Sequence, residues 1–206
     1  MKPQNNQKAK LPDDLKRCIE FHGHLCPGLV YGYLVAKDAI RRLDLKRSSD
    51  EEVVAVCEND SCAVDALQIL LGTSAGKGNL IFKDYGKNAY TILNRTTGKA
   101  FRFSRTKSYA YTGDSQKEFE RLDAAVSSGE VTERDKWRHK LLKATDLISQ
   151  PFDNVFTVRE VEFVMPPFAP LARSESCAEC GEMTMSTKLV VADSGKQVCI
   201  PCAEIA

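Results

Sequence analysis

Apolar and polar residues alternate along the first part of the chain with the periods of helices and strands. From residue 29 to residue 43, apolar or small residues recur every three to four positions, and charged residues fill the other face, which predicts an amphipathic helix. The run V-V-A-V-C at 53–57 is continuously apolar, as in a buried strand. Proline, capping and glycine boundaries predict two shorter helices, at 12–21 and from residue 59 to Gly72.

The remaining pattern predicts further strands and helices and then a boundary. The expected elements are strands within 79–94 and 99–104, helices at 115–128 and 132–149, and a strand within 155–165. The segment P-P-F-A-P-L-A-R-S-E-S at 166–176 is rich in prolines and small residues, which predicts a linker. We therefore expect an α+β core domain, with a mixed α/β fold, at 1–165 and a small second domain at 177–206.

Composition excludes several classes of protein and bears on whether the cysteines bind metal or form disulfides. With 43% hydrophobic residues, 28% charged residues and a net charge of +1, the chain as a whole is neither a disordered protein nor one that coats a polyanion. It has no apolar run of about 20 residues for a membrane span and no signal peptide, so we expect a cytoplasmic protein. In a reducing compartment, eight cysteines favour metal binding over disulfides. Cys18 lies outside every cluster and is interpreted as structural.

Paired cysteines at the end of the chain predict a metal site. The pairs are Cys177-x2-Cys180 and Cys199-x2-Cys202, separated by eighteen residues, the spacing of a four-cysteine zinc-ribbon or treble-clef domain. Because four thiolates complete a tetrahedral coordination sphere, this Zn²⁺ should be structural; a redox thiol pair or an iron centre is the alternative. Residues 177–206 carry two lysines and four acidic residues, which argues against nucleic acid as a partner.

A second cluster of metal-ligating residues lies in F-H-G-H-L-C-P-G at 21–28. If this stretch is extended, His22, His24 and Cys26 alternate along the chain and project from one face. Pro27 suits the first position of a helix, so Cys26 should be the N-cap, where helix amides favour the thiolate. The alternative is that this thiol is a small buried apolar group.

Cys57 ends the predicted strand at 53–57, and Asp60 and Cys62 lie where the next helix is expected to begin. Open α/β sheets bind ligands at such strand-to-helix junctions, whereas core packing is the alternative for both thiols. The candidate catalytic residues are therefore His22, His24, Cys26, Asp60 and Cys62, and the candidate ligands of a second metal are His24, Cys26 and Cys62. Gly28 and Gly32 form a close-contact face, either for a second copy of the chain or within the chain.

A basic stretch between Lys77 and Lys107 contains eight lysines and arginines and one aspartate. This excess of positive charge would attract a small acidic ligand or an acidic partner, unless it is a solvated strand face.

Four pieces of the chain together resemble the FmdE family of formylmethanofuran dehydrogenase components. They are F-H-G-H-L-C-P-G at 21–28, E-N-D-S-C-A-V-D-A at 58–66, G-K-G-N-L-I-F-K-D-Y-G-K at 76–87, and the paired C-x-x-C motifs. The resemblance implies an α+β or α/β core, a zinc-finger tail and a homodimer. The family takes its name from the molybdenum or tungsten enzyme that reduces CO₂ to a formyl group on methanofuran, although its members also occur where that pathway is in doubt.

Three functions are compatible with these features. The first is a metal-binding subunit or accessory of a formylmethanofuran dehydrogenase-type one-carbon redox system, in a complex with oxidoreductase subunits. The second is a stand-alone metal- or thiol-dependent enzyme, because a metal held by two or three protein ligands keeps an open position. The third is a zinc-ribbon module for protein interaction or regulation.

Overall fold

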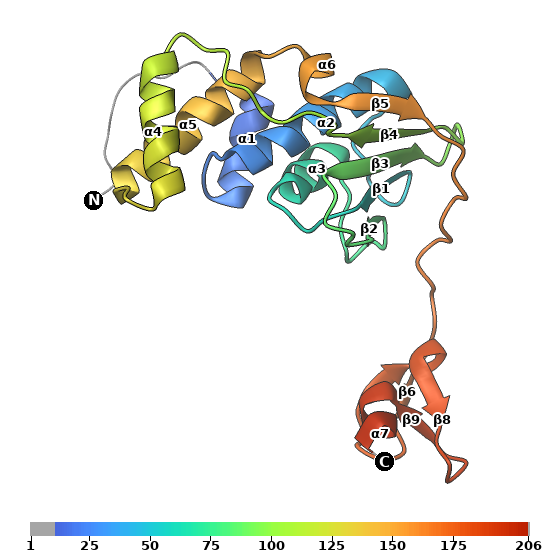
Figure 1. The fold of residues 1–206 in the computed structure, drawn as a ribbon. Helices are drawn as coiled ribbons and strands as arrows, with labels where there is room; N and C mark the ends of the chain where they lie inside the picture. The colour runs from blue at the N-terminus through green and yellow to red at the C-terminus, as the bar shows by residue number, and fades with distance from the viewer. Residues whose placement is uncertain (1–10, 206) are drawn as a thin grey trace. The chain divides into compact units, whose positions relative to one another are not determined.

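The computed structural model describes residues 11–205 and consists of two compact units (Figure 1). The first unit runs to Phe168 and the second begins at Ala169. The first unit is a mixed α/β core and the second holds the four paired cysteines, as predicted from the sequence. No helix in the described part of the chain is long and apolar enough to span a membrane.

An open five-stranded sheet forms the centre of the core unit. Its strands are β1 (Val53–Cys57), β2 (Leu80–Phe82), β3 (Ala89–Asn94), β4 (Ala100–Ser104) and β5 (Thr157–Glu160). The order across the sheet is β2-β1-β3-β4-β5, and only the β1–β2 pair is parallel. Every residue of β1 and β3 is buried, because these strands lie in the middle of the sheet and both of its faces are covered.

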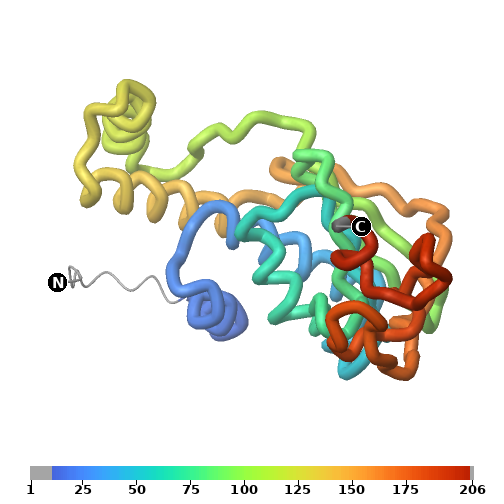
Figure 2. The backbone as a smooth tube through the Cα atoms, turned by 90° about the horizontal axis from the view of Figure 1, so that it is seen from below, coloured from blue at the N-terminus to red at the C-terminus, as the bar shows by residue number. Residues whose placement is uncertain are grey.

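The core unit also contains helices, of which the first three along the chain cover one face of the sheet. The helices are α1 (Asp13–His22), α2 (Pro27–Leu43), α3 (Ala63–Leu71), α4 (Gln116–Ser128), α5 (Glu133–Ser149) and the short α6 (Phe152–Val155). Alternate residues of β1, such as Ala55 and Cys57, join the large core beneath α1–α3, whereas Val54 and Val56 face a smaller cluster. The α4–α5 hairpin lies at the end of the unit away from the sheet (Figures 1 and 2).

The late strand is shorter than the sequence pattern suggested. The apolar run was expected to form a strand within 155–165, but β5 ends at Glu160. Val161, Phe163 and Met165 instead pack on the small cluster of Val54 and Val56, on the face of the sheet opposite the large core. The alternation of these three residues therefore places them over that face of the sheet, although the Val161 amide still donates to the carbonyl oxygen of Ala100 in β4.

Gly28 and Gly32 bring α2 into close contact with α3 of the same chain. A Cβ atom at Gly32 would lie 1.9 Å from the carbonyl oxygen of Ala63, and one at Gly28 would lie 3.0 Å from the Cβ of Cys62. The first distance allows no side chain at all, so α2 packs directly on the backbone at the start of α3. The interpretation of this face as a contact between two copies of the chain is wrong, because α3 already occupies it.

Gly32→Ala is expected to lower the free energy of unfolding of the core unit by about 3 kcal/mol, since the new methyl group must push α2 and α3 apart. Urea unfolding followed by circular dichroism measures the change. Gly76→Ala is the matched control, because a Cβ there meets no atom within 4 Å. Equal stability of the two variants would contradict the close contact.

The second unit is built from two small hairpins and a final helix. Its elements are β6 (Ser174–Ser176), β7 (Met183–Met185), the 3₁₀ turn η1 (Ser186–Lys188), β8 (Leu189–Val191), β9 (Gln197–Cys199) and α7 (Ile200–Ile205). Among the residues of this unit whose burial is described, only Val198 and the thiols of Cys177 and Cys199 form a buried core. So small an apolar core cannot by itself offset the conformational entropy of folding.

Candidate functional site

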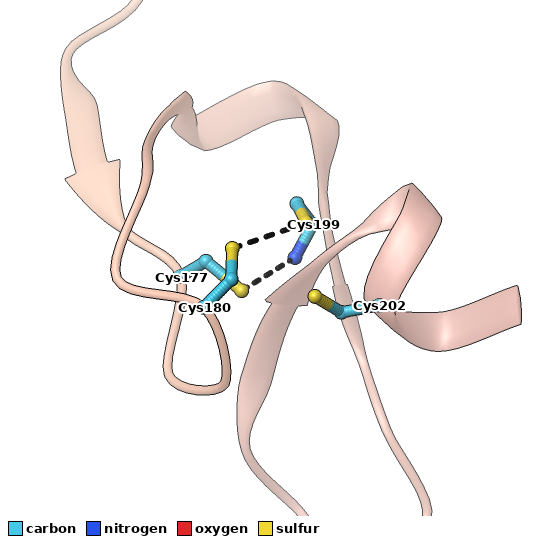
Figure 3. Close-up of side chains that lie close together, drawn as sticks. All are labelled: Cys177, Cys180, Cys199 and Cys202. Atoms are coloured by element: carbon cyan, nitrogen blue, oxygen red, sulfur yellow. Dashed lines mark hydrogen bonds between the residues drawn. The ribbon is translucent and has the colours of Figure 1, made fainter. Parts of the chain in front are cut away.

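The four cysteines of the second unit converge on one point (Figure 3). Cys177 and Cys180 flank the turn between β6 and β7, Cys199 ends β9, and Cys202 lies in α7. Their sulfur atoms all lie within 4.8 Å of one another, and the Cys180 and Cys199 sulfurs are 3.8 Å apart. Two thiolates on a tetrahedral zinc, with Zn–S bonds of about 2.3 Å, are separated by about 3.8 Å, so this donor set fits Zn²⁺.

Backbone amides and neighbouring thiols shift the pKa values of Cys177 and Cys202 in opposite directions. The amides of Cys180 and Cys199 lower the pKa of Cys177 to about 6, and the latter amide donates to its sulfur over 3.2 Å. The thiols of Cys199 and Cys180 raise the pKa of Cys202 to about 12. The turn geometry thus stabilises the Cys177 thiolate through the backbone.

In the core unit, the chain turns sharply between α1 and α2 and brings three ligand groups together. His22 is the last residue of α1, Gly23 caps that helix in the left-handed conformation at φ +89°, and Cys26 begins α2. The ring centroids of His22 and His24 lie 4.5 Å apart. The ligand atoms of His22, His24 and Cys26 are all within 4.8 Å of one another. The extended conformation expected for this stretch is wrong, because His22 is helical and the turn at Gly23 produces the convergence. We call these three residues the His/Cys cluster.

Cys26 is the N-cap of α2, as expected, and its sulfur accepts a hydrogen bond from the amide of Leu29 over 3.4 Å. The expected thiolate character is not found: burial raises the pKa of Cys26 more than the Leu29 amide lowers it, and the Cys62 thiol raises it further. Cys62 is exposed at the N-cap of α3. A Cβ at Gly28 would lie 3.5 Å from the Cys62 sulfur and 3.8 Å from the Cys26 sulfur, so this glycine leaves room for both thiols.

Asp65 is the residue of this site that the sequence interpretation missed. Its Oδ2 lies 2.7 Å from Nδ1 of His22, whose Nε2 lies 3.6 Å from the Cys26 sulfur. An ionised carboxylate only accepts hydrogen bonds, so Nδ1 of His22 carries the proton and the Nε2 lone pair points to the cluster. Asp65 follows Cys62 by three residues on α3, and this spacing on one helix face was the available signal.

The other candidates of the sequence analysis lie apart from this contact. Asp60 is exposed, and among the described residues it is not part of the group of converging ligand atoms. Cys57 is fully buried in the core and burial raises its pKa to about 12, which supports the packing alternative for this thiol. Cys18 is likewise fully buried, and burial raises its pKa to about 11.

His24, which belongs to the His/Cys cluster, is exposed. Partial desolvation lowers its pKa, with smaller effects from His22 and Lys140, and this shift favours the neutral imidazole that binds metals.

Part of the basic stretch is used in internal ion pairs. Arg102 contacts both carboxylate oxygens of Glu58, at 3.0 and 2.8 Å. Arg95 pairs with Glu51 and donates to the carbonyl groups of Pro166 and Pro167. These arginines stabilise the sheet and the segment that follows it, and they are not available to an external ligand.

Comparison with known proteins agrees with this geometry. The family model described as FmdE, molybdenum formylmethanofuran dehydrogenase operon, matches residues 21–157, which is more than half of the chain. The chain belongs to the FmdE family. A second model, the prokaryotic dksA/traR C4-type zinc finger, matches residues 172–206 and confirms the zinc-finger tail.

Two individual proteins extend the comparison. An FmdE-like protein of the tungsten formylmethanofuran dehydrogenase type from Syntrophus aciditrophicus has the same fold, with a TM-score of 0.60 and 19% identity over 98% of this chain and 96% of that one. A protein of Archaeoglobus fulgidus named "Probable S-adenosyl-L-methionine-binding protein" is 30% identical over 96% of this chain. This chain spans only 54% of that relative's length. It is thus an FmdE-family protein with a C4 zinc finger and two clusters of metal-ligating side chains.

Proposed function

We propose that the His/Cys cluster binds a second metal ion and that the protein serves a one-carbon redox system of the formylmethanofuran dehydrogenase type. The observation that carries the metal site is the engagement of both His22 nitrogens, with Asp65 at Nδ1 and the Cys26 sulfur 3.6 Å from Nε2. A nitrogen and a sulfur bound to one tetrahedral zinc are about 3.5 Å apart. A metal-binding histidine also commonly donates its other N–H to a carboxylate, the role that Asp65 would have.

The donor set suits a borderline metal such as zinc. Neutral imidazoles of His22 and His24 and the thiol of Cys26 would supply three ligands, and Cys62 lies beside Cys26 on the exposed side. Three protein ligands leave one position for water or a substrate, whereas recruitment of Cys62 would close the site. A metal bound there would act as a Lewis acid on whatever occupies the open position.

The one-carbon role follows from the family and from the name of the Syntrophus relative. Within this role the protein would be a subunit or accessory that brings its metal site to an oxidoreductase complex, and the zinc finger would supply the protein contact. We retain the homodimer and the cytoplasmic location as predictions. A dimer would need a surface other than the glycine face of α2, because α3 covers that face.

A stand-alone metal- or thiol-dependent enzyme is the second candidate function. The exposure of Cys62 next to the cluster favours it, because an accessible thiol or an open metal position is what catalysis requires. The name of the Archaeoglobus relative makes S-adenosyl-L-methionine the first small molecule to test as a ligand.

Metal analysis tests the proposed site directly. We expect two metal ions per chain in the protein purified from zinc-supplemented cells, and one per chain when His24 and Cys62 are both replaced by alanine, since the tail site is unaffected. Cys199→Ser is the reciprocal control, which should lose the tail metal and keep the core metal. One metal ion per chain in both the wild type and the double alanine variant would exclude the second site.

A further inference from the structure

A cavity of about 220 Å³ lies in the core unit, and no residue of the His/Cys cluster lines it. Its walls come from α2, from the segment that follows β4 and from the end of α5 through α6. The lining includes Tyr31, Arg105, Lys107, Tyr109, Gln150 and Asn154. Since pockets for drug-sized ligands usually measure about 300–1,000 Å³, this cavity suits a smaller molecule.

The hydroxyl group of Tyr31 is a buried donor without a partner. Tyr31 is 7% exposed, and within residues 11–205 its hydroxyl oxygen has no hydrogen bond. An edge-on contact with Phe156, with ring centroids 6.0 Å apart, holds the ring in place. A buried hydroxyl without a partner costs free energy, so such a group on a cavity wall points to a bound molecule that accepts its hydrogen bond.

Two cations lie over the rings of tyrosines in the cavity wall. The guanidinium group of Arg105 lies 4.2 Å from the centre of the Tyr31 ring, and the amine of Lys143 lies 4.5 Å from the centre of the Tyr109 ring. Neither these two side chains nor Lys107 forms an ion pair with any residue that the structure describes. Burial lowers the pKa of Lys143 and Arg105 lowers it further, so the two cations feel each other's charge.

The acidic groups near these cations have other partners. Asp146 accepts hydrogen bonds from the Tyr109 hydroxyl, from the Thr112 amide and hydroxyl, and from the Gln150 amide, and these bonds use both of its carboxylate oxygens. It therefore holds the wall of the cavity in shape. Asp123, which acts on Lys143 at longer range, is paired with His139 at 3.0 Å. Arg105, Lys107 and Lys143 thus outnumber these two carboxylates, and none of the three is paired with either of them.

We propose that this cavity, the Tyr31/Arg105 pocket, binds a small oxyanion with a phosphate or carboxylate group. Arg105 would contact the anion with its fork of N–H donors, the Tyr31 hydroxyl would donate a hydrogen bond, and Lys107 would add charge at the rim. Arg105 and Lys107 in the lining, with Lys143 over the Tyr109 ring, favour a dianion, so inorganic phosphate should bind more tightly than acetate. The pocket does not depend on the proposed metal site.

Isothermal titration of the full-length protein with phosphate and with acetate, at constant ionic strength and without added metal, tests the pocket. We expect saturable phosphate binding that Arg105→Ala weakens at least about tenfold, the usual effect of losing a charge-assisted contact. Lys107→Ala should weaken it less, and it supplies a test even if Arg105→Ala folds poorly. Lys99→Ala, at an exposed lysine, and Cys62→Ala, in the other site, should bind as the wild type does.

Tyr31→Phe separates ligand binding from a purely structural role. Because this substitution removes only the buried hydroxyl, it should raise the melting temperature of the phosphate-free protein by about 3 °C. It should also lower the affinity for phosphate several-fold, since the hydrogen bond to the anion is lost. Tighter binding of acetate than of phosphate would identify a carboxylate ligand. The proposal is overturned if neither anion shows saturable binding to the wild type, or if Arg105→Ala and Lys107→Ala both bind as tightly as it does.

Discussion

Replacement of Cys199 by serine is expected to release the zinc from the second unit and to unfold residues 169–206, while the core unit stays folded. Zinc binding supplies about 10–16 kcal/mol to four-ligand domains of this size. Little other stabilisation is available to the second unit, because up to residue 204 its buried residues are Val198 and the ligands Cys177 and Cys199. Loss of one thiolate from the closed site removes most of that free energy. Metal content and limited proteolysis of the full chain measure the two effects.

Cys62→Ser is the matched control for this prediction. It makes the same chemical change at an exposed thiol of the core unit, so the protease resistance of the tail should not change. The core unit should resist protease in both variants, since the division between the units falls at residues 168 and 169. Full metal content and an unchanged tail pattern in Cys199→Ser would show that the four cysteines do not hold a structural metal.

Local patterns were sufficient to predict most of the elements. The apolar run at β1 predicted a buried strand because a central strand is covered on both faces, and Val53–Cys57 is fully buried. The capping motif at Thr132 predicted the start of α5, where the Thr132 side chain accepts from the Asp135 amide. The paired C-x-x-C motifs predicted the convergence in the tail, because the two cysteines of each pair are only three positions apart and the pairs have the spacing of a four-cysteine zinc site.

Interactions between distant residues set the remaining features. The turn at Gly23 depends on a left-handed conformation that the pattern of ligand residues does not encode, and it replaced the expected extended segment. From the sequence alone, the Gly28/Gly32 face could contact either a second copy of the chain or another element of the same chain. The structure shows that it contacts the backbone of Ala63 in α3. The contact between His22 and Asp65 joins residues 43 positions apart, which periodicity within one element cannot reveal.

Asp65→Asn is expected to weaken Zn²⁺ binding at the His/Cys cluster by about 10–100-fold, the usual effect of losing a carboxylate partner of a metal-binding histidine. The carboxylate fixes the proton on Nδ1 of His22 and leaves Nε2 free to coordinate. An asparagine amide can also donate to Nδ1, and the proton then moves to Nε2 and blocks coordination. Competition with a chromophoric chelator measures the affinity for Zn²⁺.

Asp60→Asn is the matched control, because it removes the same charge from an exposed carboxylate five positions earlier in the chain. It should leave the affinity near that of the wild type, whereas the sequence alone had favoured Asp60 over Asp65 as the acidic residue of the site. Equal affinity of all three proteins would remove Asp65 from the site, and equal loss in both variants would indicate a long-range effect of charge.

The same pair of variants makes a prediction for thiol reactivity. Added Zn²⁺ should slow the iodoacetamide labelling of Cys62 and Cys26 in the wild type and in Asp60→Asn, because a bound thiolate is shielded from alkylation. In Asp65→Asn, the same protection should need about 10–100 times more Zn²⁺. Cys18 reports the rate of a fully buried thiol. If Cys26 and Cys62 are labelled as slowly as Cys18, with or without Zn²⁺, the cluster is core packing and binds no metal.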